Sequence, residues 1–385
     1  MLDFSGHIIS KLPNAGTSIF AVMSKLAAEH GAINLSQGFP DFPISPKLIA
    51  RVNHYMKKGF NQYAPMPGVK PLREAIAAKA RQTYGVSYDV DSEITVTAGA
   101  TQAIYTAISA FVKDGDEVII FEPAYDSYAP AVKVNGGTVK YVELKAPLFK
   151  INWDEVKKMV SSNTRMIIIN SPHNPSGSLL ETNDLNSLDA LTRNTDIIVL
   201  SDEVYEHMVY DGKTHHSVCA WPELVKRSLV IGSFGKTFHA TGWKTGFVLA
   251  PERLTVEFRK LHQFTVFASN TPIQYAIADF LGDEANYLGI SDFYQAKRDF
   301  FDEKIKASRF EVLPSYGTYF QLLSYKNISK ETELDFAKKL VSEHGIALIP
   351  VSPFYSKQTN QQLLRVCFAK QEETLTKAAE VLCRI

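Results

Sequence analysis

Residues 228–246, SLVIGSFGKTFHATGWKTG, run from an apolar, strand-like segment into a loop that carries two lysines, Lys236 and Lys244. Other short segments rich in valine and isoleucine precede it, separated by stretches of helical periodicity; they span residues 93–99, 117–121, 165–170 and 196–200. Such alternation is typical of a mostly parallel sheet covered by helices. We therefore predict an α/β fold in which Lys236 lies at the end of a central strand.

The last hundred residues have a different pattern. Long helical stretches around residues 293–305, 334–341 and 375–382 are separated by short apolar runs at 319–323 and 363–368. This pattern indicates a smaller α+β domain. We therefore divide the chain into an N-terminal arm with part of the small domain (1–40), a large domain (41–282) and a small C-terminal domain (283–385).

The composition excludes several classes of partner. Lysine plus arginine and aspartate plus glutamate each total 41 in 385 residues, so the zero net charge gives no sign of a nucleic-acid or membrane partner. The three cysteines lack metal-ligand or disulfide spacing, and no apolar run has the length of a membrane span or the form of an export signal. We expect a cytoplasmic protein that binds small molecules and a second copy of itself.

Lys236 is the first candidate for chemistry. A lysine amine can form a Schiff base with an aldehyde, and in a site of low dielectric constant it can also carry protons. The aldehyde that proteins use in this way is pyridoxal phosphate. An isolated lysine in a glycine-containing loop is normally a solvated surface residue, so the interpretation depends on its neighbours.

A carboxylate near the pyridine nitrogen is the second requirement of that cofactor, because it keeps the nitrogen protonated and the ring able to accept electrons. Asp202 follows the apolar run 197–200, which places it at the carboxyl edge where open α/β sheets bind ligands. The alternative for Asp202 is an ordinary helix N-cap or a carboxylate in the first turn of a helix.

A phosphate group requires backbone N–H groups and positive charge. Gly99, Ala100 and Thr101 lie between a predicted strand and a predicted helix, where the helix dipole attracts anions. Ser233 and Lys244 supply a hydroxyl group and a cation. The alternative is that Gly99 only permits a tight turn.

Four further residues could make the remaining contacts with the cofactor and with an amino-acid substrate. Tyr125 offers an aromatic face for the ring, and Tyr205 offers a hydroxyl group for the phenolic oxygen, although both could simply pack in the core. Arg365, within an apolar run, suits the carboxylate of an amino-acid substrate, with a structural ion pair as the alternative. The amide of Asn174 suits the cofactor or that carboxylate, and Asn174 before proline is otherwise a common turn signal.

These motifs, in this order and at this spacing, resemble the class I aminotransferases of fold type I across nearly the whole chain. The segments that carry the resemblance are Asn174-Pro175, Asp202-Glu-Val-Tyr205, Ser233-Phe-Gly-Lys236 and Arg365. Residues 34–42, 61–65 and 171–175 resemble the branch that contains kynurenine aminotransferase, glutamine transaminase K and bacterial methionine aminotransferase. Within that branch, residues 63–68, 125–130 and 368–370 most resemble the methionine enzymes.

The resemblance implies a large domain with a mostly parallel seven-stranded sheet, a smaller α+β domain, and pyridoxal 5'-phosphate as the cofactor. It implies that Lys236 is the covalent attachment point and proton carrier, that Asp202 pairs with the ring nitrogen, and that Tyr125 stacks on the ring. The phenolic oxygen would be contacted by Tyr205 and Asn174. The phosphate group would be held by Gly99, Ala100, Thr101, Ser233 and Lys244. Lys244 is a departure, since the family usually has arginine there.

The resemblance also implies how substrate binds. Its carboxylate would be held by Gly38, Asn174 and Arg365. Tyr63 would reach the phosphate group in the neighbouring subunit, so the resemblance implies a homodimer with shared active sites.

The absence of charge in one segment indicates which class of amino donor the enzyme accepts. The stretch 264–270, which resembles the position of a second arginine in dicarboxylate-specific relatives, is uncharged. We therefore expect a neutral, apolar or aromatic amino donor, with methionine first and phenylalanine, tyrosine, kynurenine and glutamine behind it, and a 2-oxo acid acceptor in a ping-pong reaction. Phe20, Phe39, Tyr63 and Phe267 are candidates for the side-chain pocket, with simple core packing as the alternative.

Two other functions stay open at this point. A cysteine-S-conjugate β-lyase would use the same lysine. A regulator of the same fold would carry an added helix-turn-helix domain, for which the aminotransferase-like sequence, beginning by about residue 12, leaves no room. We reject a metal site at His207, His215 and His216, because that polar stretch has the composition of a solvated turn.

Overall fold

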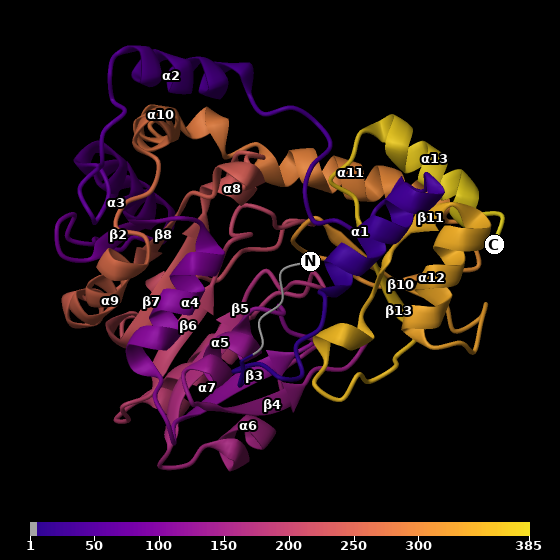
Figure 1. The fold of residues 1–385 in the computed structure, drawn as a ribbon, viewed down its shortest axis with the longest axis horizontal. Helices are drawn as coiled ribbons and strands as arrows, with labels where there is room; N and C mark the ends of the chain where they lie inside the picture. Colours follow the sequence, from indigo (N-terminus) through magenta and orange to yellow (C-terminus); the bar gives the residue numbers. More distant parts are fainter. Residues whose placement is uncertain (1–5) are drawn as a thin grey trace.

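The protein is described from a computed structural model that covers residues 6–385. A seven-stranded sheet forms the centre of its larger part (Figure 1). In spatial order its strands are β2 (Ile94–Thr97), β8 (Gly246–Leu249), β7 (Ser228–Ser233), β6 (Ile198–Asp202), β5 (Thr164–Asn170), β3 (Glu117–Glu122) and β4 (Thr138–Glu143). All neighbours are parallel except β8, which runs antiparallel to both β2 and β7. The predicted α/β class is confirmed.

Two strands of this sheet, β4 and β8, were not predicted from the sequence. Strand β4 lies at the edge of the sheet with most of its residues partly or fully exposed, so it lacks a continuous apolar run. Strand β8 has only four residues and begins at a glycine. The other strands lie within a few residues of their predicted positions, because burial on both faces requires apolar side chains throughout.

Helices cover both faces of this sheet (Figure 1). Helix α4 packs on β6, β7 and β8 through the face that the sequence predicted, which includes Ile104, Ile108 and Phe111. Helix α6 begins after Asn152, whose side chain caps it by accepting from two backbone N–H groups. The helices of this part are α2 (Pro46–Lys57), α3 (Lys70–Tyr84), α4 (Ala100–Phe111), α5 (Tyr128–Val134), α6 (Trp153–Met159), α7 (Thr182–Thr192), α8 (Phe234–Thr237), α9 (Glu252–Thr265) and α10 (Thr271–Leu281).

A second, antiparallel sheet organises the C-terminal part. Its strands in order are β12 (Ile349–Pro350), β13 (Leu363–Cys367), β10 (Phe320–Ser324) and β9 (Glu311–Val312). Figure 1 shows helices around this sheet, namely α11 (Ile290–Ile305), α12 (Glu333–His344) and α13 (Glu372–Leu382). This is the smaller α+β unit expected from the sequence.

The N-terminal segment packs against the C-terminal part. Helix α1 (Ile19–His30) contacts α12, and β1 (Ile33–Asn34) pairs in parallel with β11 (Ile346–Ala347). This arrangement agrees with an arm that joins the small domain. The domain limits at residues 40 and 282 stay predictions, and residues 1–5 lie outside the described part.

The ends of three central strands define the edge that faces the second sheet. Strands β5, β6 and β7 end at Asn170, Asp202 and Ser233, and Asn170 lies beside Asp202 in the strand register. Carboxyl ends of parallel strands are where open α/β sheets bind ligands. Within residues 6–385, no helix combines the length and the apolar character needed to cross a membrane.

Candidate active site

All but one of the residues expected to hold the cofactor or the substrate carboxylate line a single cavity of about 230 Å³ at this edge, and Phe20 lines it with them. They are Phe20, Gly38, Gly99, Ala100, Thr101, Tyr125, Asn174, Asp202, Tyr205, Ser233, Lys236, Lys244 and Arg365. The exception is Tyr63. The geometry thus brings together residues from both sheets, and their individual roles stay predictions.

Lys236 lies in the one-turn helix α8, immediately after β7. Its Nζ donates to Tyr319 Oη at 2.6 Å and lies 3.4 Å from the carbonyl oxygen of Gly38. Burial lowers the pKa of Lys236 to about 8, and the nearby cations Arg365 and Lys244 act in the same direction. A larger fraction of Lys236 is therefore uncharged near neutral pH, and the uncharged amine is the nucleophilic form.

Tyr319 was missed as a site residue, because it is only the first residue of a predicted strand in the sequence. Its ring is fully buried, and its hydroxyl group accepts from Lys236 while donating to the carbonyl oxygen of Gly38 at 2.6 Å. Tyr319 therefore links the candidate lysine to the glycine expected at the substrate carboxylate.

Replacing Tyr319 with phenylalanine is expected to lower kcat about tenfold, because hydrogen bonds to charged groups contribute about 1.5–3 kcal/mol. The measurement is steady-state kinetics with methionine and a 2-oxo acid. Tyr325→Phe is the matched control, since that hydroxyl group donates to a distant backbone carbonyl, that of Glu331. Equal kcat values for Tyr319→Phe and the wild type would show that the Tyr319 hydroxyl group has no role in catalysis.

Asp202 is the last residue of β6 and is 4% exposed. Its Oδ2 accepts from Tyr128 Oη at 2.5 Å, and its Oδ1 accepts from the backbone N–H of Val204 at 3.4 Å. Burial raises the pKa of Asp202 to about 6, while these two hydrogen bonds oppose the rise. No α-helix follows directly, so the alternative role as a helix N-cap is wrong.

Tyr128→Phe is expected to move the acid limb of the pH–rate profile to higher pH by about one unit. The Tyr128 hydroxyl group stabilises the ionised form of Asp202 and lowers its pKa, so its removal raises that pKa. Asp202 would then become protonated and inactive at a higher pH. Tyr141→Phe on β4 is the control, and an unchanged acid limb in Tyr128→Phe would contradict this role.

The N-terminus of α4 opens toward the proposed phosphate position. Gly99 precedes this helix with φ 81°, and no side chain caps the helix or places an acidic group in its first turn. A Cβ at Gly99 would approach Lys244 Cε to 3.3 Å, so glycine leaves room for the lysine. Thr101 Oγ1 lies 3.1 Å from Tyr125 Oη. The free N–H groups and Lys244 make this end of the cavity suited to an anion.

Arg365 lies on β13 and is 1% exposed. Its Nη1 donates to Asn174 Oδ1 at 2.9 Å and its Nη2 to the carbonyl oxygen of Ser36 at 3.2 Å, while its buried Nε has no hydrogen-bond partner. Among residues 6–385 no carboxylate lies within 4.0 Å, so the alternative of a structural ion pair is wrong. A buried guanidinium without an acidic partner is suited to a ligand carboxylate.

Asn170 is a second residue that the sequence interpretation missed. Its Nδ2 donates to the backbone carbonyl of Asp202 at 2.9 Å, and its Oδ1 accepts from the backbone N–H of Asn174 at 2.9 Å. The signal was available, because Asn170 ends a predicted strand just as Asp202 does. Asn170 holds the two neighbouring loops at the same edge of the sheet.

The aromatic residues expected around the side-chain pocket divide into two groups. Phe20 lines the cavity, and the Arg365 guanidinium lies 3.9 Å from the ring centroid of Phe320, which the sequence did not predict as a site residue. Phe39, Tyr63 and Phe267 do not line this cavity and are 43%, 85% and 45% exposed in the single chain, so their place in the pocket stays a prediction. Tyr63 instead packs edge-on against Phe267, with ring centroids 5.5 Å apart.

The polar stretch is solvated as expected at residues 211–214, which are exposed and begin with a turn, but two of the three histidines lie in the interior. His207 and His215 have side chains that are only 11% and 6% exposed. His215 Nε2 lies 2.8 Å from Glu203 Oε2, and burial lowers the pKa of His207 to about 3. The described part of the chain contains no group of three or more His, Cys, Asp or Glu side chains arranged to hold a metal ion.

The comparison with protein families identifies the class of enzyme. The family described as Aminotransferase class I and II matches residues 30–382. The chain belongs to the class I and II aminotransferases. This family is pyridoxal-phosphate dependent, and its members transfer an amino group between an amino acid and a 2-oxo acid. The family predicted from the motifs is confirmed.

Characterised relatives match this aminotransferase over nearly its whole length. Methionine aminotransferase from Escherichia coli is 49% identical, with 97% of each chain covered. Human kynurenine–oxoglutarate transaminase 1 is 33% identical, with 93% of each covered. An E. coli crystal structure described as identifying a methionine aminotransferase function matches with a TM-score of 0.96 at 48% identity, covering 98% of this aminotransferase and 100% of that chain. The fold type I architecture is therefore confirmed.

Proposed function

We propose that this aminotransferase takes its amino group from methionine and passes it to a 2-oxo acid in a ping-pong reaction. The proposal rests on the number of cationic side chains that line the cavity. Only Lys236, Lys244 and Arg365 line the cavity as lysine or arginine, and each has another assignment. No cation is left for a distal carboxylate, which favours a neutral donor. The near full-length similarity to a methionine aminotransferase supports methionine among neutral donors.

The cavity fits pyridoxal 5'-phosphate at three points. The open N-terminus of α4 with Ser233 and Lys244 would hold the phosphate group, Tyr125 would stack on the ring, and Asp202 would pair with the ring nitrogen. Tyr205 and Asn174 would contact the phenolic oxygen. When bound, the cofactor supplies an aldehyde for the amino group and a ring that accepts electrons from the substrate α-carbon.

The residues of the chain then have distinct tasks. Arg365 and Asn174 would bind the substrate carboxylate, together with the backbone at Gly38, and so fix the orientation of the α-carbon. Lys236 Nζ would take the proton from that carbon, a task suited to an amine whose pKa lies near 8. Tyr319 would hold Lys236 in position between proton transfers.

A second copy of the chain would complete the site. Tyr63, Phe264 and Phe267 are large and exposed, with Tyr63 and Phe264 at 85% and 84% exposure. Exposed aromatic residues that lie together are typical of interfaces between proteins. We propose a homodimer in which Tyr63 reaches the phosphate group of the neighbouring subunit. The cytoplasm stays the proposed location, supported by three cysteines that are all free.

Lys244→Ala is expected to weaken cofactor binding about tenfold, because the variant lacks one charge-assisted hydrogen bond to the phosphate group. Equilibrium dialysis of pyridoxal phosphate gives the dissociation constants. Lys244→Arg restores the residue common in the family and should bind at least as tightly as the wild type. Lys260→Ala is the control, since Lys260 is an exposed lysine paired with Glu257. An unchanged dissociation constant for Lys244→Ala would show that Lys244 does not bind the phosphate group.

Steady-state kinetics with a panel of amino donors and several 2-oxo acids test which substrates the enzyme prefers. Methionine should give the highest kcat/KM, ahead of phenylalanine, tyrosine, kynurenine and glutamine, and double-reciprocal plots should be parallel. Aspartate as the best donor would contradict the proposal. Pyruvate and ammonia released from a cysteine conjugate without any acceptor would support the alternative β-lyase activity.

A further inference from the structure

A second cavity of about 210 Å³ lies beside the candidate active site. Neither the cofactor nor the substrate of the proposed reaction would occupy it. It is nearly as large as the active-site cavity of about 230 Å³. The two cavities share Asn170, so strand β5 contributes to both. Its apolar side is formed by Phe121, Phe149, Leu144 and Ile168. A space of this size and lining is suited to a small organic ligand.

The polar side of this second cavity carries both signs of charge. Lys150 Nζ lies 3.5 Å from Glu181 Oε1, and Glu181 and Asp184 also cap the start of α7. Lys213 comes from a different loop, and its Nζ lies 4.5 Å from the ring centroid of Tyr316. No carboxylate within residues 6–385 lies within 4.0 Å of Lys213 Nζ. The charged lining residues are two lysines and two acids, so their charges sum to zero; Lys150 pairs with Glu181, whereas Lys213 is left without a carboxylate among the described residues.

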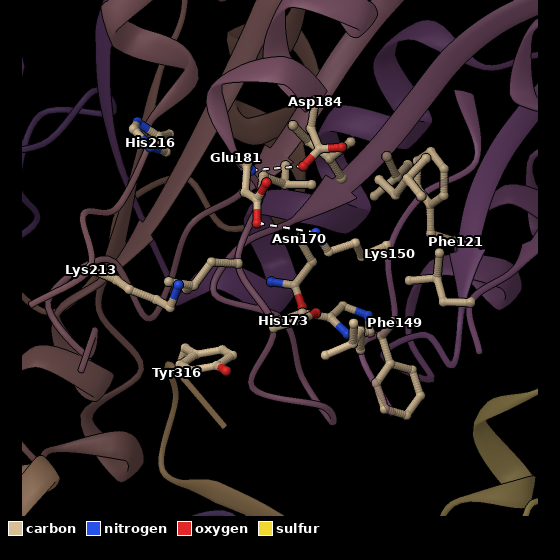
Figure 2. Close-up of a pocket in the computed structure, with 18 of the residues that line it drawn as sticks. Phe121, Phe149, Lys150, Asn170, His173, Glu181, Asp184, Lys213, His216 and Tyr316 are labelled. Carbon is tan, nitrogen blue, oxygen red and sulfur yellow. Dashed lines mark hydrogen bonds and ion pairs between the residues drawn. The ribbon is translucent and has the colours of Figure 1, made fainter. Parts of the chain in front are cut away.

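Figure 2 shows how these groups face one another across the space. Lys213 and Tyr316 lie on one side, Phe121 and Phe149 on the other, and Glu181 lies between them with Lys150. A ligand that matches this pattern has a carboxylate, an ammonium group and an apolar side chain. An apolar anion would pair with Lys213 but would leave Glu181 with Lys150 and the α7 backbone as its only partners in the described chain.

We propose that this cavity is a second binding site for a free α-amino acid with an apolar side chain. The carboxylate pairs with Lys213, the ammonium group with Glu181, and the side chain packs on Phe121 and Phe149. This goes beyond the proposed reaction, because binding here involves neither Lys236 nor the cofactor.

The second site is connected to the candidate active site by two side chains that line it. Tyr128 donates to Asp202 Oδ2, and Asn170 donates to the backbone carbonyl of Asp202. A ligand that fills the second cavity would contact both Tyr128 and Asn170, the two side chains that donate to Asp202.

Equilibrium dialysis with α-methylphenylalanine tests the proposal. This probe has no α-proton and cannot be transaminated, and borohydride reduction of the holoenzyme beforehand prevents it from reacting with the cofactor. The wild type should bind the probe, and Lys213→Gln should weaken one class of binding at least about tenfold, as expected when a charge-assisted hydrogen bond is removed. Leu179→Trp, which places a large ring in the cavity, should abolish the same class.

Lys145→Gln is the matched control, because Lys145 is exposed on a neighbouring loop and lies outside this cavity. It should bind like the wild type. Identical binding curves for the wild type, Lys213→Gln and Leu179→Trp would overturn the proposal, as would no binding of the probe at all. A chain that bound the probe through Lys213 but took up no cofactor would contradict the proposed reaction and leave this inference intact.

Discussion

Lys236→Ala is expected to lower kcat by at least about 10⁴-fold, because the change removes both the covalent attachment point and the group that moves the α-proton. General acid–base catalysis alone contributes about 10²–10⁴-fold. The measurement is kcat with methionine and a 2-oxo acid at saturating cofactor, so that weaker cofactor binding does not account for the decrease. The Lys236 side chain donates only to Tyr319 and Gly38, so the fold should be little affected.

Lys226→Ala is the matched control for that experiment. Lys226 is an exposed lysine paired with Glu223, far from the strand ends that form the site. Its kcat should equal that of the wild type. A kcat for Lys236→Ala within tenfold of the wild type would contradict the assignment of the lysine.

Arg365→Leu is expected to lower kcat/KM by roughly 30- to 5000-fold, which corresponds to about 2–5 kcal/mol for removing one partner of a buried charged pair. The guanidinium is fully buried beside Asn174 and Phe320, and no carboxylate in the described chain neutralises it. The measurement is kcat/KM for methionine. Arg365→Lys keeps the charge without the planar fork and should lie between Arg365→Leu and the wild type.

A substrate lacking the carboxylate separates a binding role from a structural one. With 3-(methylthio)propylamine, the wild type and Arg365→Leu should react at similar, slow rates, because this amine has no carboxylate for the guanidinium to bind. An equal decrease in rate for methionine and for this amine would show that Arg365 only maintains the fold. That outcome would contradict the proposed role.

Much of the fold could be predicted because buried strands leave a clear signal. Strand β5 contains three consecutive isoleucines, Ile167 to Ile169, all of them buried. Burying each such side chain contributes about 1.5–3 kcal/mol, so the pattern is strongly constrained. Strand β4 lacks this constraint, because it lies at an edge and most of its residues are exposed or half-buried. Strand β8 was missed although all four of its residues are buried.

The candidate site was predictable where a residue follows a strand end or stands out chemically. Asp202 and Lys236 follow apolar runs, and Arg365 is a charged residue within one. Tyr128 and Tyr319 have no such signal, because a tyrosine in an apolar neighbourhood normally packs in the core. Their roles arise from hydrogen bonds between residues that are 74 and 83 positions apart, with Asp202 and Lys236 respectively. Only the three-dimensional arrangement shows such pairs.

The expectation that His215 is exposed was wrong for a related reason, although the turn at residues 211–214 before it is exposed. Composition alone gives polar residues a high chance of exposure, but His215 is paired with the buried Glu203, which also accepts from Ser201 and from the backbone at Val218. A buried carboxylate that collects donors can hold a histidine in the interior. The sequence does not indicate which carboxylate does so.

Borohydride reduction followed by peptide mapping is the most direct test of the central claim that Lys236 carries the cofactor of an aminotransferase. The protein is incubated with pyridoxal phosphate, reduced, digested and analysed by mass spectrometry. The mass of the reduced cofactor should be found on the peptide that contains Lys236, and prior incubation with methionine should prevent the attachment. Attachment at Lys244 or elsewhere instead of Lys236, or no attachment at all, would contradict the account.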